Sequence, residues 1–123
     1  MIEMQKVYEL SERIVQHFHP QKVILFGSYA YGAPTEDSDV DILVIMPFEG
    51  KGAYQSAEIA TTTRPRFPVD FLARTPEQIK KRLELGDFFI KEIIEKGKVL
   101  YEDSLLDKLL VKDFSDTNFT NFH

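Results

Sequence analysis

One stretch of this chain constrains its fold more than any other. An apolar strand over residues 22–26 runs into Gly27-Ser28, and ten residues after this pair a second apolar strand opens with Asp39 and Asp41. Side chains two residues apart in a strand share a face, with Cβ atoms about 7 Å apart, so the two aspartates can converge on one site. The stretch therefore predicts two central strands of a sheet, joined by a turn and a short helix, with a pair of carboxylates on the second strand.

The two aspartates predict a metal site. Two ionised carboxylates repel each other at short range, so the pair needs either a proton or a compensating cation. Mg²⁺ meets this need because it binds through one or two carboxylates and completes its shell with water and substrate phosphates. The alternative is that Asp39-x-Asp41 is only the solvated end of a strand, beside the turn that residues 34–38 indicate.

The glycine-serine pair predicts a phosphate site. Gly27 can adopt backbone angles that are closed to other residues, and it lets a phosphate approach the main chain. Ser28 is expected to cap a helix through Tyr29 to Tyr31, and a helix N-terminus attracts anions. Each motif alone is common, but their order along the chain places phosphate at the turn, metal on the strand and a nucleotide between them.

The spacing of these motifs resembles a known family. Gly27-Ser28, ten residues and then Asp39-x-Asp41 is similar to the signature of the DNA polymerase beta-like nucleotidyltransferase superfamily, and the short chain resembles its minimal nucleotidyltransferase (MNT) branch. The resemblance runs from the first helix to Tyr101. It implies the α+β nucleotidyltransferase (polymerase beta-like) fold, in which helices flank a small mixed sheet.

The resemblance also implies roles for individual residues. Asp39, Asp41 and Asp70 match the catalytic and metal-binding carboxylates of the family, which hold two Mg²⁺ ions, and Asp70 comes from a later strand predicted over residues 67–73. Gly27 and Ser28 match its phosphate-binding pair. We therefore expect transfer of a nucleoside monophosphate, AMP from ATP, to a hydroxyl acceptor with release of pyrophosphate.

The chain departs from the family at one point, because many members carry an arginine where Tyr29 or Tyr31 stands here. Four basic residues flank the later strands and are the available substitutes for this arginine. Residues of this kind are usually surface groups, so none of the four is assigned to the site. They are Lys51, Arg64, Arg66 and Arg74.

The expected partner also follows from the resemblance. Many minimal nucleotidyltransferases are antitoxins of HEPN/MNT toxin-antitoxin pairs, and some adenylylate a tyrosine of the toxin, which implies a HEPN-domain ribonuclease toxin as partner and acceptor. The acids share strand faces with apolar residues (Asp41 with Leu43, Asp70 with Leu72), which predicts an apolar sheet face that C-terminal leucines or another protein would cover. The alternatives are a homodimer that modifies a small molecule and a non-catalytic antitoxin, binding or structural subunit.

The composition of the chain excludes several kinds of functional site and binding partner. The net charge of −5 opposes direct binding to DNA or RNA, whose affinity comes mainly from basic contacts to phosphate. The absence of cysteine excludes disulfides, thiolate zinc sites and a cysteine nucleophile. The sequence contains no apolar run of membrane-spanning length and no secretory signal, so we expect a soluble, cytoplasmic protein.

Periodicity places the other elements. Apolar residues at helical spacing predict a first helix over residues 2–18, and further helices are predicted to begin at Thr75-Pro76 and to cover 88–96, before an edge strand at 98–101. Residues 48–66 read as a loop with a short helix at 53–60. We expect one nucleotidyltransferase domain over residues 1–103 and a C-terminal helix and tail over residues 104–123.

Overall fold

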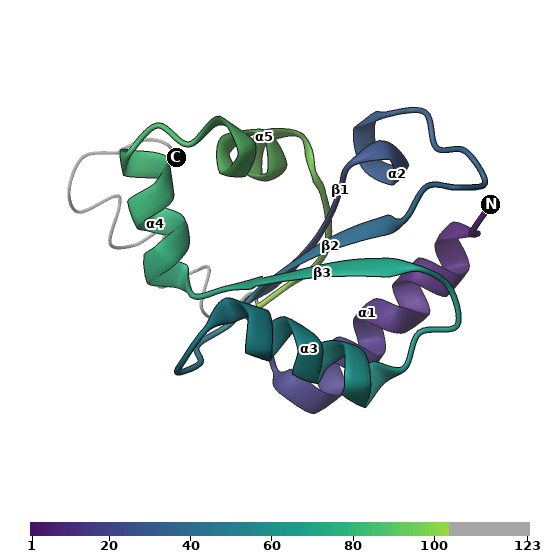
Figure 1. Ribbon diagram of the computed structural model, residues 1–123, viewed down its shortest axis with the longest axis horizontal. Helices are drawn as coiled ribbons and strands as arrows, with labels where there is room; N and C mark the ends of the chain where they lie inside the picture. Colours follow the sequence, from purple (N-terminus) through teal and green to yellow (C-terminus); the bar gives the residue numbers. More distant parts are fainter. Residues whose placement is uncertain (104–123) are drawn as a thin grey trace.

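A four-stranded mixed sheet forms the centre of the computed structural model, which describes residues 1–103 (Figure 1). Its strands lie in the order β3-β2-β1-β4. β1 is antiparallel to both β2 and β4, whereas β2 and β3 are parallel. The bounds are β1 Lys22–Phe26, β2 Val40–Ile45, β3 Val69–Arg74 and β4 Lys98–Glu102. The predicted α+β fold is confirmed, with the two predicted central strands at its centre.

Helices cover both faces of this sheet. α1 and α3 lie on one face, and α4 and α5 lie on the other, while the single turn of α2 sits at one end beside the start of β2 (Figure 1). The bounds are α1 Met4–Phe18, α2 Ser28–Tyr31, α3 Gly52–Thr63, α4 Pro76–Glu84 and α5 Phe88–Lys96. No helix among residues 1–103 is long and apolar enough to cross a membrane.

Strand alternation divides the apolar side chains between two clusters. Val40, Ile42 and Val44 of β2 are fully buried in the cluster under α1 and α3. Leu43 and Ile45 point the opposite way, into a cluster with Ile79 of α4 and Ile93 of α5. The central strand therefore reads as an almost continuous apolar run because both of its faces are buried.

The prediction of a sheet face left for C-terminal leucines or a partner to cover is wrong. Leu43, on the same face as Asp41, is fully buried, and Ile45 is only 6% exposed. α4 and α5 cover these residues, and both helices lie within the described part of the chain. The expected C-terminal helix and tail, residues 104–123, lie outside the described residues.

Two local predictions have different outcomes. The helix expected at Thr75-Pro76 is confirmed, because Thr75 and Gln78 form a reciprocal capping box at its start. The short helix expected at 53–60 within the loop of residues 48–66 is present as α3, but it is longer than predicted, because it continues through the threonine run to Thr63. The hydroxyls of Thr61 and Thr63 donate to the carbonyl oxygens four residues earlier, so these side chains are satisfied within the helix.

Candidate active site

The sheet brings the predicted carboxylates together at one end. β2 and β3 are parallel, and their register pairs Asp41 directly with Asp70. Asp39 lies one residue before the start of β2. The side chains of Asp39 and Asp70 are exposed, and that of Asp41 is half-buried. Because the parallel strands begin side by side, the three acids predicted from the sequence lie at the same end of the sheet.

Gly27 lies against the carboxylate of Asp41. It follows β1, whose last residue, Phe26, is the antiparallel partner of Asp41. Its backbone has φ 74° and ψ −155°, a conformation that is essentially restricted to glycine. A Cβ built on Gly27 would overlap Asp41 Oδ2 and lie 3.1 Å from Asp41 Cγ. The turn therefore needs glycine both for its conformation and for the space that Asp41 occupies.

The electrostatics of Asp41 differ from those of an ordinary surface aspartate. Burial raises its pKa above the usual value, and the nearby carboxylates of Asp70 and Asp39 raise it further. The protein therefore favours the protonated form of Asp41, compared with an aspartate in water, unless a cation compensates the charge of the ionised carboxylate. This is the electrostatic signature expected of a metal ligand in a protein without its metal.

The donor set fits Mg²⁺, although the site is not preformed. Within residues 1–103, no three acidic or histidine side chains are already gathered as a metal-binding cluster. Like charges are expected to keep carboxylates apart until a cation draws them together. The carboxylates of Asp39, Asp41 and Asp70 nevertheless come from neighbouring positions of the sheet, and two of them are exposed. Carboxylate oxygens are the ligands that a hard divalent ion prefers.

The predicted capping role of Ser28 is wrong. The N-cap of α2 is Gly27, which makes no side-chain cap bond, and Ser28 is the first residue of the helix. Because Ser28 follows the N-cap position by one residue, its hydroxyl is not placed to accept hydrogen bonds from the free backbone N–H groups of the first turn. Gly32 closes the other end of α2, where its N–H donates to the Ser28 carbonyl at 3.2 Å.

Ser28→Ala is therefore expected to change the free energy of unfolding by less than about 0.5 kcal/mol, as for an ordinary surface substitution. If the hydroxyl binds a phosphate, the same variant weakens binding of Mg²⁺-ATP. Thermal melts and calorimetry measure the two effects separately. A loss of about 1 kcal/mol in stability would restore the capping role, and unchanged ATP affinity would remove Ser28 from the site.

The two tyrosines at the usual arginine positions have different surroundings. The hydroxyl of Tyr29 accepts from the backbone N–H of Ile2 at 3.2 Å, and its ring packs on the α1 side of the sheet. Tyr29 is thus engaged with the N-terminal segment, on the opposite face from Asp41. Tyr31 is 37% exposed at the end of α2.

The four basic residues that flank the later strands lie away from the acids. Lys51 and Arg74 come after β2 and at the end of β3, whereas Asp41 and Asp70 are near the starts of these strands. Arg64 and Arg66 lie at the correct end but line a groove of about 740 Å³ on the α1 side. Arg74 shares the sheet face of Asp41 but stands at the far end of β3, in register with Ile45, so none of the four lies beside the acids.

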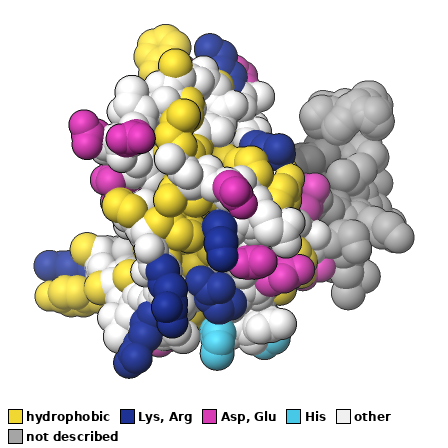
Figure 2. Space-filling model, turned by 90° about the vertical axis from the view of Figure 1, so that its right-hand side faces the viewer, with side chains coloured by type: hydrophobic (Ala, Val, Ile, Leu, Met, Phe, Trp, Pro, Cys, Tyr) yellow, Lys and Arg dark blue, Asp and Glu magenta, His cyan; other side chains and the backbone are white. Residues whose placement is uncertain are grey.

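That groove is lined by four basic side chains and by two acidic ones, Glu3 and Glu9. Its basic lining residues are Lys6, Arg13, Arg64 and Arg66, and Arg13 also donates from Nε to the Thr63 carbonyl at 3.3 Å. Figure 2, which views the end of the molecule carrying the N-terminus and α2, shows Lys and Arg side chains gathered beside apolar ones in its lower half. The basic side chains of the groove lie on the α1 side of the sheet, whereas Asp41 and Asp70 lie on the opposite face.

One neighbour of the site was not found from the sequence. The ring of Phe89, in the first turn of α5, contacts the ring of Phe26, the cross-strand partner of Asp41. The available signal was the pair Phe88-Phe89 directly after the Gly86-Asp87 turn, where two large apolar side chains begin a helix. Periodicity alone assigns such residues to the core, so only the packing of α5 reveals their position.

Comparison with known proteins places this geometry in a family. The model of the nucleotidyltransferase domain family matches residues 7–101. The presumed protein adenylyltransferase MJ0604 of Methanocaldococcus jannaschii is 31% identical over 83 residues, which are 66% of this chain and 78% of the relative. The family match spans both strands that carry the acids and the turn at Gly27.

Solved structures share the fold. A chain from a crystal structure of a toxin-antitoxin with AMP-PNP matches with a TM-score of 0.54 at 21% identity, over 94% of this chain and 87% of that chain. A presumed nucleotidyltransferase from Sulfolobus solfataricus matches with a TM-score of 0.52 at 21% identity, over 63% of this chain and 71% of that chain. At this level of identity the likeness concerns the fold.

Proposed function

This chain belongs to the nucleotidyltransferase domain family and is a nucleotidyltransferase, and from that premise we propose that it transfers AMP from ATP to a hydroxyl group of a partner protein. The observation that carries the proposal is the junction of Gly27, Asp41 and Asp70. A glycine turn that leaves room for a carboxylate, and a second carboxylate in register beside it, form a site for a metal and a triphosphate.

The residues of the site have distinct tasks in this reaction. Asp39, Asp41 and Asp70 hold Mg²⁺, and the backbone at Gly27 and the hydroxyl of Ser28 bind the β and γ phosphates. When bound, Mg²⁺ neutralises phosphate charge and lowers the pKa of the acceptor hydroxyl. Catalysis by these residues is therefore mainly positioning and charge compensation, without a covalent enzyme intermediate.

The chemical step is an in-line displacement at the α-phosphorus of ATP. The acceptor oxygen forms a bond to the α-phosphorus while the bond to the oxygen that bridges the α and β phosphates breaks, and pyrophosphate leaves. Asp70, whose side chain is exposed beside Asp41, takes the hydroxyl proton. The acceptor gains one AMP group, and Asp70 returns its proton to solvent.

The proposed acceptor is a HEPN-type ribonuclease toxin, with this chain as its antitoxin. Two comparisons support this choice: the relative named as a protein adenylyltransferase, and the fold shared with a chain of a toxin-antitoxin structure. The net charge of −5 is consistent with a protein acceptor, because a nucleic acid would repel such a chain.

Co-expression with the product of the neighbouring open reading frame tests the proposal. Purification of the complex in the presence of Mg²⁺-ATP, followed by intact mass spectrometry, is expected to show a partner that is heavier by whole multiples of one AMP. Co-expression with the Asp41→Asn variant is the control and is expected to leave the partner unmodified. The absence of both a complex and a mass shift would contradict the proposed partner, whereas AMP on a small molecule would favour the homodimer alternative.

A further inference from the structure

The first turn of α5 reaches the end of the sheet that carries the acids. The rings of Phe26 and Phe89 meet edge to face, with their centroids 5.8 Å apart and an interplanar angle of 83°. Phe26 and Asp41 are partners in the antiparallel pair of β1 and β2, so their side chains lie on the same sheet face, with Cα atoms about 4.5 to 5.5 Å apart. Phe89 is thus one aromatic ring away from the central carboxylate of the site.

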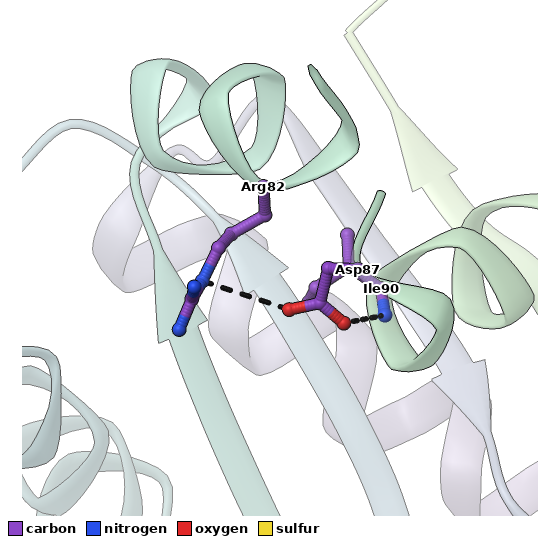
Figure 3. A network of polar contacts seen from close by, with 3 residues as sticks. All are labelled: Arg82, Asp87 and Ile90. Atoms are coloured by element: carbon purple, nitrogen blue, oxygen red, sulfur yellow. Dashed lines mark hydrogen bonds and ion pairs between the residues drawn. The ribbon is translucent and has the colours of Figure 1, made fainter. Parts of the chain in front are cut away.

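A local network fixes the start of α5 and hence the position of Phe89. Asp87 is the N-cap, and its Oδ1 accepts from the backbone N–H of Ile90 at 3.1 Å (Figure 3). Asp87 Oδ2 also lies 3.6 Å from Nε of Arg82 on α4. The buried side chains of Ile90 and Ile93 anchor the helix to the sheet. The first turn is therefore held from both sides.

The exposure of Phe89 does not match that of a core residue. Phe26 is 7% exposed, whereas Phe89 is 53% exposed and its neighbour Phe88 is 83% exposed. An aromatic ring that contacts a buried ring on one side and solvent on the other offers a flat apolar surface next to the site. Its contact with Phe26 fixes the ring without covering the outer surface.

We propose that Phe89 is the platform on which the base of the bound nucleotide stacks. The inference rests on the proposed function, because it requires a nucleoside triphosphate at Asp39, Asp41 and Asp70. In a nucleotide the ribose separates the base from the α-phosphate, and in this site the ring of Phe26 separates Phe89 from Asp41. Stacking on one aromatic face tolerates different bases, so Phe89 supplies affinity for nucleosides rather than selection of adenine.

The position of Phe89 favours a base over an interface with another protein. Of the two adjacent phenylalanines, only Phe89 contacts the ring beside Asp41. Both phenylalanines line a shallow pocket with charged residues of α5, such as Lys91 and Glu92, and Phe88 is the more exposed of the two. Of these two rings, Phe89 alone joins the pocket to the ring beside Asp41, as a base held next to the acids requires.

Calorimetry with two probes tests the inference on the full chain. Mg²⁺-ATP and inorganic tripolyphosphate share the phosphates, but only ATP carries a base. Phe89→Leu is expected to weaken Mg²⁺-ATP binding about tenfold, within the range known for loss of one base-aromatic stack, and to leave tripolyphosphate binding unchanged. Phe88→Leu, the same chemical change one residue earlier, is the matched control and is expected to bind both probes like the wild type.

A second variant keeps the test valid if Phe89→Leu fails to fold. The chain contains no tryptophan, so Phe89→Trp introduces a unique fluorophore at the proposed platform. Mg²⁺-ATP is expected to quench its emission, and tripolyphosphate is not. Phe89→Trp is also expected to bind Mg²⁺-ATP at least as tightly as the wild type, because the indole offers a larger stacking surface.

Three results would overturn the inference while leaving the triphosphate site intact. They are an equal affinity of the wild type for ATP and tripolyphosphate, an equal loss of affinity for the two probes in Phe89→Leu, and equal quenching of the tryptophan emission by the two probes in Phe89→Trp. A wild-type protein that binds neither probe in the presence of Mg²⁺ would instead overturn the proposed nucleotide site itself.

Discussion

Replacing Asp41 with asparagine (Asp41→Asn) is expected to abolish nucleotide transfer while raising the thermal stability of the metal-free protein. Burial disfavours the ionised form of Asp41, and the carboxylates of Asp70 and Asp39 add repulsion, so the pKa of Asp41 is raised. A neutral amide removes this repulsion. It also removes the central metal ligand, and activity and stability therefore change in opposite directions.

The pH dependence of stability follows from the same shift. The folded protein holds the Asp41 proton more tightly than the unfolded chain does, because the folded pKa lies above the ordinary value of 3.8. The contribution of this group to stability is therefore greatest below the ordinary pKa and falls as the pH rises through the raised folded pKa. The stability of Asp41→Asn does not fall in this way, because asparagine does not ionise. The variant is therefore expected to exceed the wild type in stability most at neutral pH without metal.

Thermal melts of both proteins at acidic and neutral pH, with EDTA and with Mg²⁺-ATP, measure these effects. Mg²⁺-ATP is expected to stabilise the wild type and not the variant, since a ligand stabilises only the state that binds it. Asp37→Asn makes the same chemical change on the exposed loop before β2 and should leave transfer unchanged. A variant that retains transfer, or is less stable than the wild type at neutral pH, would contradict the role of Asp41.

Gly27→Ala is expected to have the second largest effect, on both stability and activity. A non-glycine residue in the conformation of Gly27 costs of order 1–3 kcal/mol, and the added methyl group would overlap Asp41 Oδ2. For a domain of this size, a loss of 1 kcal/mol lowers the melting temperature by roughly 4 to 8 °C. The carboxylate of Asp41 must also move, so transfer is expected to be lost even where the variant remains folded.

Gly50→Ala separates the two causes. Gly50 also has a positive φ, 85°, but a Cβ there would meet no atom within 4 Å. It is expected to lose stability without losing transfer. Transfer assays below the melting temperature of each variant make the comparison, and a Gly27→Ala protein that is folded and fully active would show that the turn need not approach Asp41.

The sequence was most informative where local chemistry determines structure. The bounds of β1 and α5 follow from apolar runs ended by Gly27 and Gly97, and the start of α4 follows from Thr75-Pro76 with Gln78. The acids at positions 39, 41 and 70 could be named because their spacing matches a family. In the structure they lie at one end of the sheet, as that match implied.

What the sequence could not show depends on tertiary packing. The parallel register that sets Asp41 beside Asp70 joins strands far apart in the chain, and no local pattern specifies it. The cover that α4 and α5 provide for Leu43 was missed because helical periodicity does not say which sheet face a helix covers. The cap of α2 was misassigned by one residue, which is a common error at helix boundaries.

The source of the transferred phosphorus tests the central claim most directly. The co-expressed partner is incubated with the wild-type protein, Mg²⁺ and ATP that carries a label either at the α-phosphorus or at the γ-phosphorus. We predict that the partner acquires the α label and not the γ label, and that Asp41→Asn transfers neither. Transfer of the γ label, or transfer of the α label by Asp41→Asn, would contradict nucleotidyl transfer at this site.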